Sequence, residues 1–247
     1  MNTQNKIANY TLCSISFEIS SNYEANLQTL LQHIKECPSH SIITAPEVCL
    51  SGFDYKNLQK AVDFSKKAEE QLKKVSHHKV IILTMLDTQK NKIYNIAKIF
   101  FRGDILYQRA KARLFHLGDE HKYMEEGDDK DIQIITIDGI KIALLICFEL
   151  RFKELWQKVE GADVIAVLSY WGALRKEHFY TLTKALAIIN QCYVLATDAR
   201  NKDCTKINAI ISPQGSIYQD DTKNIITLPF SKKEIKKMRR YLQVGIK

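Results

Sequence analysis

Apolar and polar positions alternate along this chain in a way that predicts strands and helices in turn. Apolar and β-branched runs typical of buried strands cover residues 7–17, 41–47, 80–85, 93–101, 105–111, 140–146, 163–168, 193–197, 207–212 and 225–228. Helices are predicted over residues 22–37, with Ser21 as the candidate cap, over 58–75, after Cys147, over 178–190 and over 231–242. No internal repeat or low-complexity linker interrupts this alternation. We therefore expect a single α/β domain over residues 1–247.

Three of the predicted strands end in side chains whose chemistry is complementary. Cys147 directly follows the apolar run 140–146, and Lys111 ends the run 105–111. Glu47 follows Pro46, which cannot donate to a sheet ladder and so ends its strand. Because open α/β sheets carry their reactive groups at the carboxyl ends of strands, these side chains are candidates for one active site.

A thiol, a carboxylate and an ammonium group together suit nucleophilic attack on a carbonyl carbon. A free cysteine has a pKa of about 8.5, so little thiolate is present near neutrality. A carboxylate within hydrogen-bond reach of Cys147 takes the thiol proton as the sulfur attacks. An ammonium group stabilises the thiolate and then the oxyanion, and the backbone N–H of Phe148, next to the nucleophile, is a candidate second donor.

Around these three residues the sequence resembles the nitrilase superfamily, the carbon–nitrogen hydrolases. Residues 46–53, 111–115 and 146–152 are similar to its glutamate, lysine and cysteine blocks in order and separation, and the resemblance extends to about residue 230. It implies a four-layer α-β-β-α sandwich with two sheets packed face to face. It also implies an amidase that needs no cofactor and commonly forms homodimers. The implied roles are general base for Glu47, oxyanion stabiliser for Lys111 and nucleophile for Cys147.

Two further segments resemble the ω-amidase-like branch, whose members cleave the side-chain amides of small keto acids. Residues 119–127 contain Glu120, which matches the second glutamate of many members, and residues 170–178 follow a predicted strand. In this second segment Trp171 and Arg175 are the candidate substrate-binding residues, because an arginine fork suits a carboxylate. The chain departs from the branch at Gly172, where proline is usual, and in segments 186–190 and 206–208.

Each of these assignments has an alternative. Glu125 or Glu126 could take the place of Glu120 as the second glutamate. The alternative for Arg175 is a surface charge that pairs with Glu177 and does not bind substrate. Hydrolysis of an N-carbamoyl amine, amidotransfer from the acyl-enzyme and a non-catalytic binding protein are the alternative functions. A metal site is disfavoured because the helical His-Glu-x-x-His signature is absent. The residues that would form it are His116, Glu120, His121, Glu125 and Asp128.

Composition favours a cytoplasmic enzyme that acts on small molecules. Six cysteines without a Cys-x-x-Cys pair indicate a reducing compartment, residues 1–6 lack the layout of a signal peptide, and no apolar run reaches membrane-span length. Much of the excess in the net charge of +8 lies in residues 231–242, a basic helix with Ile235, Met238 and Leu242 at helical spacing as its inward face. Since no nucleic-acid motif accompanies that helix, we expect an amide substrate and neither nucleic acid nor membrane as partner.

Overall fold

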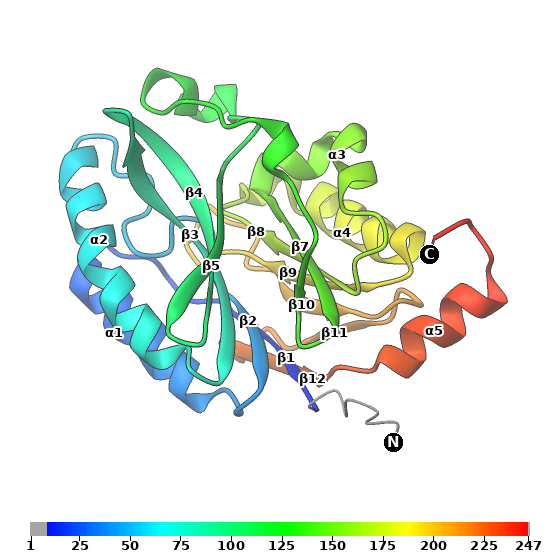
Figure 1. The fold of residues 1–247 in the computed structure, drawn as a ribbon. Helices are drawn as coiled ribbons and strands as arrows, with labels where there is room; N and C mark the ends of the chain where they lie inside the picture. The colour runs from blue at the N-terminus through cyan, green and yellow to red at the C-terminus, as the bar shows by residue number, and fades with distance from the viewer. Residues whose placement is uncertain (1–8, 247) are drawn as a thin grey trace.

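Two six-stranded sheets packed face to face form the centre of the molecule (Figure 1). The computed structural model describes residues 9–246. In the order β12-β1-β2-β3-β4-β5, the first sheet contains β1 (Thr11–Ile15), β2 (Ser41–Thr44), β3 (Lys79–Gln89), β4 (Lys92–Phe101), β5 (Asp104–Ala110) and β12 (Ile225–Pro229). In the order β11-β10-β9-β8-β7-β6, the second contains β6 (Ile135–Ile137), β7 (Ile140–Ile146), β8 (Val164–Leu168), β9 (Tyr193–Thr197), β10 (Asn208–Ile211) and β11 (Ile217–Gln219).

Each sheet is built around three parallel strands, β1-β2-β3 in one and β7-β8-β9 in the other. Helical crossovers join these strands, as parallel pairing requires. They are α1 (Tyr23–Glu36) and α2 (Leu58–Val75) in the first half, and α3 (Lys153–Lys158) and α4 (Lys176–Asn190) in the second. Figure 1 shows the two helix pairs on opposite sides of the molecule, outside the sheets. The predicted four-layer α-β-β-α sandwich is confirmed.

Successive side chains of a strand point to opposite faces of the sheet. Apolar side chains of the central strands therefore lie alternately between the two sheets and between a sheet and its helices. Ile42 of β2 belongs to the core between the sheets, together with Leu144 and Ala166 of the second sheet. Its neighbour Ile43 points the other way and packs with Leu30 of α1 in the layer between sheet and helices. Both faces of the central strands are thus buried, which explains why these strands read as continuous apolar runs.

Several element boundaries differ from the sequence prediction. The predicted first strand includes residues 7 and 8, which lie outside the described residues together with the segment examined for a signal peptide. The cap of α1 is Asn22 rather than Ser21, because the Asn22 side chain accepts the Ala25 N–H. The helix expected after Cys147 begins as a 3₁₀ turn over Cys147–Arg151 before α3. The short edge strands β6 and β11 were not predicted, since three residues carry too little pattern.

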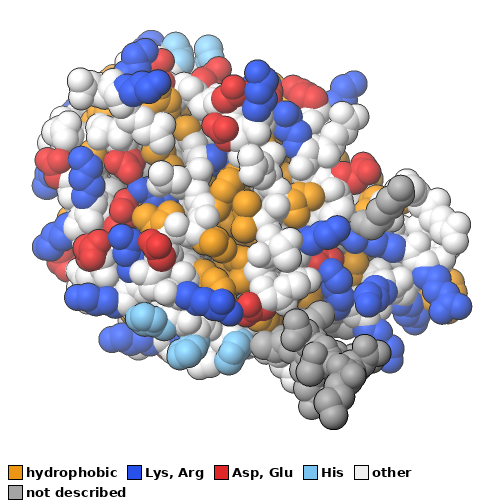
Figure 2. Space-filling model, viewed as in Figure 1, with side chains coloured by type: hydrophobic (Ala, Val, Ile, Leu, Met, Phe, Trp, Pro, Cys, Tyr) orange, Lys and Arg blue, Asp and Glu red, His pale blue; other side chains and the backbone are white. Residues whose placement is uncertain are grey.

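The basic C-terminal segment forms α5 (Lys232–Tyr241), and Figure 2 shows Lys and Arg side chains gathered over it. Ile235 is buried and Met238 is half-buried, whereas Leu242 lies beyond the end of the helix and is exposed, so its predicted inward orientation is wrong. The buried carboxylate of Asp163 pairs with Lys232 and holds the helix against the second sheet. In residues 9–246 no helix is long and apolar enough to cross a membrane.

A buried ion pair links β5, at the edge of the first sheet, to the turn that follows β7 of the second. Arg109 of β5 donates to both carboxylate oxygens of Glu149, at 2.7 and 2.5 Å, and neither side chain is exposed. Glu149 also accepts the backbone N–H groups of Ile146 and Ala112, each at 2.7 Å. Because these bonds satisfy the carboxylate, the cost of burying its charge is offset. The pair fixes the chain where β7 ends and where β5 leads into Lys111.

Arg109→Met should therefore strongly destabilise the fold. The substitution leaves Glu149 charged, buried and without its cation, which typically costs about 3–5 kcal/mol. Denaturant unfolding of the purified variant measures this loss. Arg102→Met is the matched control, because Arg102 also bridges toward the second sheet through Asp138 but is 69% exposed, and such a pair contributes less than about 1 kcal/mol. Equal losses in the two variants would contradict the assigned importance of the buried pair.

Candidate active site

The side chains at the ends of β2, β5 and β7 meet in one buried cluster. Lys111 Nζ lies 2.7 Å from Glu47 Oε1, and 2.8 and 2.9 Å from the two carboxylate oxygens of Glu120. The Cys147 thiol lies close enough to the Glu47 carboxylate for each group to shift the pKa of the other. The structure therefore brings together the three residues predicted from the strand ends and Glu120 from the loop, with Lys111 bonded to both carboxylates and Cys147 beside Glu47.

Glu47 is held in place from three sides. Its Oε1 accepts the Asn95 side-chain amide at 2.8 Å as well as Lys111, and its Oε2 accepts the backbone N–H of Tyr170 at 3.2 Å. The next residue, Val48, has a φ of +43°, a strained value for a β-branched residue, and its N–H donates to the Thr84 hydroxyl at 2.7 Å. Burial raises the pKa of Glu47 above its ordinary value, and the Lys111 ammonium opposes that shift only in part.

Cys147 occupies a sharp turn at the point where β7 gives way to the 3₁₀ turn. Its φ is +43°, and the preceding N–H of Ile146 is held by Glu149. Strained backbone at a nucleophile persists where neighbouring bonds enforce it, as they do here. Burial, and then the carboxylate of Glu47, raise the pKa of the thiol well above its ordinary value, against the effect of Lys111. The resting side chain is thus a thiol that needs a base.

Lys111 stays charged because two carboxylates surround it. Burial by itself lowers the pKa of the ammonium group, but Glu47 and Glu120 outweigh that effect, so the pKa lies above the ordinary value. The acids that competed with Glu120 in the sequence are engaged elsewhere. Glu125 pairs with Lys92 at 3.0 Å, and Glu126 accepts the backbone N–H of Leu114.

The loop that carries Glu120 returns to the sheet at Gly127. A Cβ at this position would lie 2.7 Å from the carbonyl oxygen of Ala110, so only glycine fits this approach. The alternative metal site of this loop is not assembled, since His116 and His121 stack on each other and Glu120 binds Lys111. Within residues 9–246, no three His, Cys, Asp or Glu side chains are grouped to hold a metal ion.

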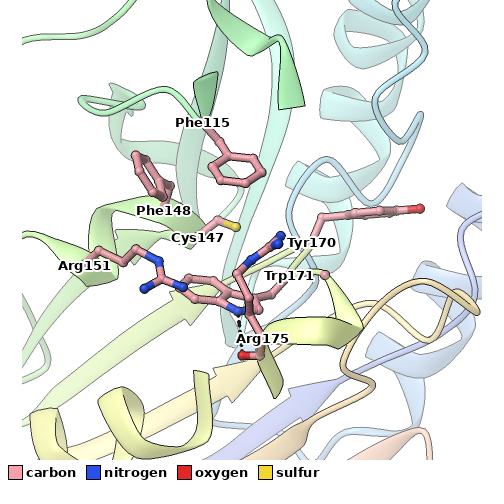
Figure 3. A pocket seen from close by; sticks show the side chains of 8 residues that line it. Phe115, Cys147, Phe148, Arg151, Tyr170, Trp171 and Arg175 are labelled. Carbon is pink, nitrogen blue, oxygen red and sulfur yellow. Dashed lines mark hydrogen bonds between the residues drawn. The ribbon is translucent and has the colours of Figure 1, made fainter. Parts of the chain in front are cut away.

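A small cavity opens onto Cys147. Both predicted substrate-binding residues, Trp171 and Arg175, line it, and Figure 3 shows them facing the Cys147 sulfur together with Phe115. Trp171 is central to the cavity wall. Its backbone N–H donates to the buried Asp198 at 2.7 Å, its indole N–H donates to the Arg175 carbonyl at 3.0 Å, and Arg151 stacks over its ring at 4.8 Å.

Three contributors to this site were not predicted from the sequence. Arg151 was visible four residues after Cys147, inside the cysteine block, but was not singled out as a ligand. Asn95 sits within a strand and carries no signal of its contact with Glu47. The third is the backbone N–H of Tyr170, which contacts Glu47 and lowers the pKa of Cys147. A main-chain donor cannot be recognised from residue type.

The arrangement combines a buried thiol, a carboxylate in contact with it and a buried cation next to both. Such a set can form and break an acyl-thioester without a metal or cofactor taking part. The guanidinium groups of Arg151 and Arg175 add positive charge at the mouth of the same cavity. Their mutual repulsion, after burial, lowers the pKa of Arg151.

Comparisons with known proteins agree with this geometry. The carbon–nitrogen hydrolase family profile matches residues 6–240. The 2-oxoglutaramate amidase of Bacillus subtilis (strain 168) is 30% identical over 224 residues, covering 85% of this chain and 86% of that protein. The omega-amidase YafV of Escherichia coli (strain K12) is 24% identical over 200 residues, covering 78% of this chain and 77% of YafV.

Solved structures of the same superfamily share this fold. The crystal structure of Saccharomyces cerevisiae Nit3, a member of branch 10 of the nitrilase superfamily, matches with a TM-score of 0.79 at 22% identity, covering 96% of this chain and 95% of Nit3. With the family profile extending over nearly the whole sequence, the chain belongs to the carbon–nitrogen hydrolase family of the nitrilase superfamily and is an amidase.

Proposed function

We propose that this amidase hydrolyses small amides that carry a carboxylate, as ω-amidases do with keto-acid amides. One observation carries the proposal. Arg151 and Arg175 line the same small cavity as Cys147. Within residues 9–246 the arginines that pair with a carboxylate are Arg102, Arg109, Arg113 and Arg239, and neither cavity arginine is among them. Two guanidinium groups beside the nucleophile without a carboxylate partner suit an anionic substrate, although Arg151 also contacts His178 Nδ1 at 3.0 Å. The relative named 2-oxoglutaramate amidase is named for an amide that carries a carboxylate.

Acylation begins with attack of the Cys147 sulfur on the amide carbonyl carbon. Glu47, which lies beside the thiol, takes its proton as the new C–S bond forms. The Lys111 ammonium and the backbone N–H of Phe148 stabilise the oxyanion. When the tetrahedral intermediate collapses, the C–N bond breaks, Glu47 returns the proton to the leaving nitrogen, and ammonia departs.

Deacylation repeats these steps with water in place of the thiol. Glu47 takes a proton from the water, the hydroxyl oxygen bonds to the thioester carbon, and the C–S bond breaks. The proton returns to the sulfur, and a carboxylic acid leaves. Glu120 supports both half-reactions by holding Lys111 at 2.8 and 2.9 Å, so the ammonium group keeps its position while Glu47 alternates between charged and neutral.

The size and charge of the cavity define the substrate further. The cavity is small, which suits a short amide rather than a folded peptide chain. The aromatic wall of Phe115, Phe148 and Trp171 packs against its aliphatic part. Arg175 and Arg151 bind the carboxylate, with Arg175 as the main ligand. An N-carbamoyl amino acid, which also carries a carboxylate, is the alternative substrate that a panel of compounds must include.

We also propose that the enzyme acts in the cytoplasm and forms a homodimer. All six cysteines are free thiols in the structure, which suits a reducing compartment. The dimer rests on the resemblance to the superfamily. Sedimentation of the purified protein at several concentrations measures its oligomeric state.

The nucleophile assignment predicts a covalent intermediate. Cys147→Ala should abolish turnover and retain the fold, because alanine keeps the Cβ of cysteine and removes only the sulfur atom. Mass spectrometry of the wild-type enzyme quenched during turnover should show the acyl adduct, which is substrate minus ammonia, on Cys147 alone. Adduct formation on any of the five other cysteines, or activity in the alanine variant, would exclude the assignment.

Removing the base or the oxyanion cation should each be severely damaging. Glu47→Gln should lower kcat by about 10²–10⁴, and Lys111→Met by about 10²–10³ or more. Because the base must be deprotonated and burial raises its pKa, kcat/KM of the wild type should rise with pH along a limb centred above 4.5, the ordinary glutamate value. Glu125→Gln is the control, since Glu125 is half-exposed and remote from the thiol. A mild effect of Glu47→Gln would refute its role.

The assignment of Arg175 as the ligand of the substrate carboxylate predicts that its substitution changes the selectivity between charged and neutral amides. Arg175→Lys keeps the charge but loses the planar fork, so charge-assisted bonding to the substrate weakens. The ratio of kcat/KM for succinamate to that for butyramide, which lacks the carboxylate, should fall about 10- to 100-fold. Initial rates of ammonia release on both amides measure the ratio. Equal losses on the two substrates, or an uncharged amide as the best compound of a panel, would refute the carboxylate assignment.

A further inference from the structure

The guanidinium group of Arg175 lies directly over Gly172. A Cβ built on Gly172 would stand 2.7 Å from Arg175 Nη2 and 3.5 Å from Cζ, and the third nearest atom is Nη1 of the same side chain. No real Cβ contact is as short as the first of these. The position now occupied by the guanidinium therefore exists only because residue 172 has no side chain.

The backbone does not require glycine at this position. Gly172 has φ −64° and ψ 137°, an extended conformation that every amino acid adopts. Glycine has more conformational freedom than alanine in the unfolded chain. Where the native backbone is compatible with alanine, the protein with glycine is therefore less stable toward unfolding. The three nearest neighbours of the added Cβ all belong to one flexible side chain, so the protein would tolerate the substitution by moving Arg175.

Arg175 has few other contacts that fix where its guanidinium lies. It is half-buried, its Cζ lies 5.2 Å from the centre of the Phe115 ring, and no described side chain forms an ion pair with it. Figure 3 shows the guanidinium turned toward the Cys147 sulfur beneath Phe115. Displacement by a Cβ at residue 172 would carry it away from Gly172, changing its distance from the reacting carbon.

We infer that Gly172 is a specificity-determining residue, which leaves space for the Arg175 guanidinium beside Cys147 and thereby selects amides with a carboxylate. This inference rests on the proposed function of Arg175. It adds that a side chain as small as a methyl group at residue 172 redirects the enzyme toward neutral amides without weakening the fold. Gly172 acts through Arg175 and is a positioning residue.

A double-mutant cycle tests the inference with the full chain. Gly172→Ala, Arg175→Ala and the double variant are compared by the ratio of kcat/KM for succinamate to that for butyramide. We expect Gly172→Ala to lower the ratio about tenfold, mainly through KM for succinamate, because a displaced guanidinium loses its charge-assisted bonds. In the Arg175→Ala background the added methyl group should leave the ratio unchanged, since it no longer meets a guanidinium. Thermal unfolding of Gly172→Ala should occur at the wild-type temperature or above.

The possible failures are distinguishable. If Arg175→Ala lowers the ratio but Gly172→Ala does not, the inference about Gly172 is wrong and the proposed function stands. A ratio that Arg175→Ala leaves unchanged overturns both. A fall that persists when Gly172→Ala is made in the Arg175→Ala background shows that the methyl group acts on the cavity directly, which also overturns the inference. Succinate binding to the Cys147→Ala enzyme, with and without Gly172→Ala, provides a readout without turnover.

Discussion

The ammonium group of Lys111, buried between two carboxylates, is the constraint on which the rest of this structure depends. A lone buried cation is too costly to keep charged, so Lys111 requires Glu47 and Glu120 within 3 Å. Those contacts in turn fix the end of β2 against the end of β5 and draw the loop of Glu120 down onto the sheet. The cluster carries one more negative charge than positive when both carboxylates are ionised. Moving the thiol proton to Glu47 removes that excess from the carboxylates and transfers it to the sulfur, where it becomes nucleophilic.

The arginines at the cavity mouth complement this excess of negative charge. In the proposed function, a substrate carboxylate is repelled by Glu47 and Glu120 and attracted by Arg151 and Arg175, so electrostatics orients the substrate before chemistry begins. The proposed orientation directs the amide end to Cys147 and keeps the carboxylate end at the mouth of the cavity. Orientation of this kind supplies part of the catalytic effect, because the reacting carbon is presented to the sulfur in one geometry. The buried pair of Arg109 and Glu149 has a different task, since it is fully satisfied within the protein and sets the turn that carries Cys147.

The sequence pattern was sufficient for the order of most elements because both sheets have parallel centres, whereas the two-sheet sandwich was predicted from the resemblance to the nitrilase superfamily. Strands buried on both faces give continuous apolar runs, and the crossover helices between them give helical spacing, so the order of elements was readable. Glu47, Lys111 and Cys147 could be predicted as one candidate site because strand ends are marked by Pro46 and by the change from apolar to polar residues, and the structure brings the three side chains together. The edge strands β6 and β11 were missed, as three residues show no period. Asn95 and the Tyr170 N–H were also missed, because their contacts with Glu47 join segments far apart in sequence. Asn95 comes from β4 of the same sheet, and Tyr170 follows β8 of the other sheet.

Gly172 is a residue that stands out in the sequence but whose role only the structure explains. In the sequence it was visible only as a departure, a glycine where the branch that the chain resembles usually has proline. Its φ of −64° is one that proline also adopts, so the backbone gives no reason for the difference. The reason emerges from the neighbouring side chain, since proline and alanine both place a Cβ where the Arg175 guanidinium now lies. A chain with proline at this position must hold that arginine elsewhere. The exchange of one rigid residue for glycine thus changes the position of a charge in the cavity while leaving the path of the main chain as it was.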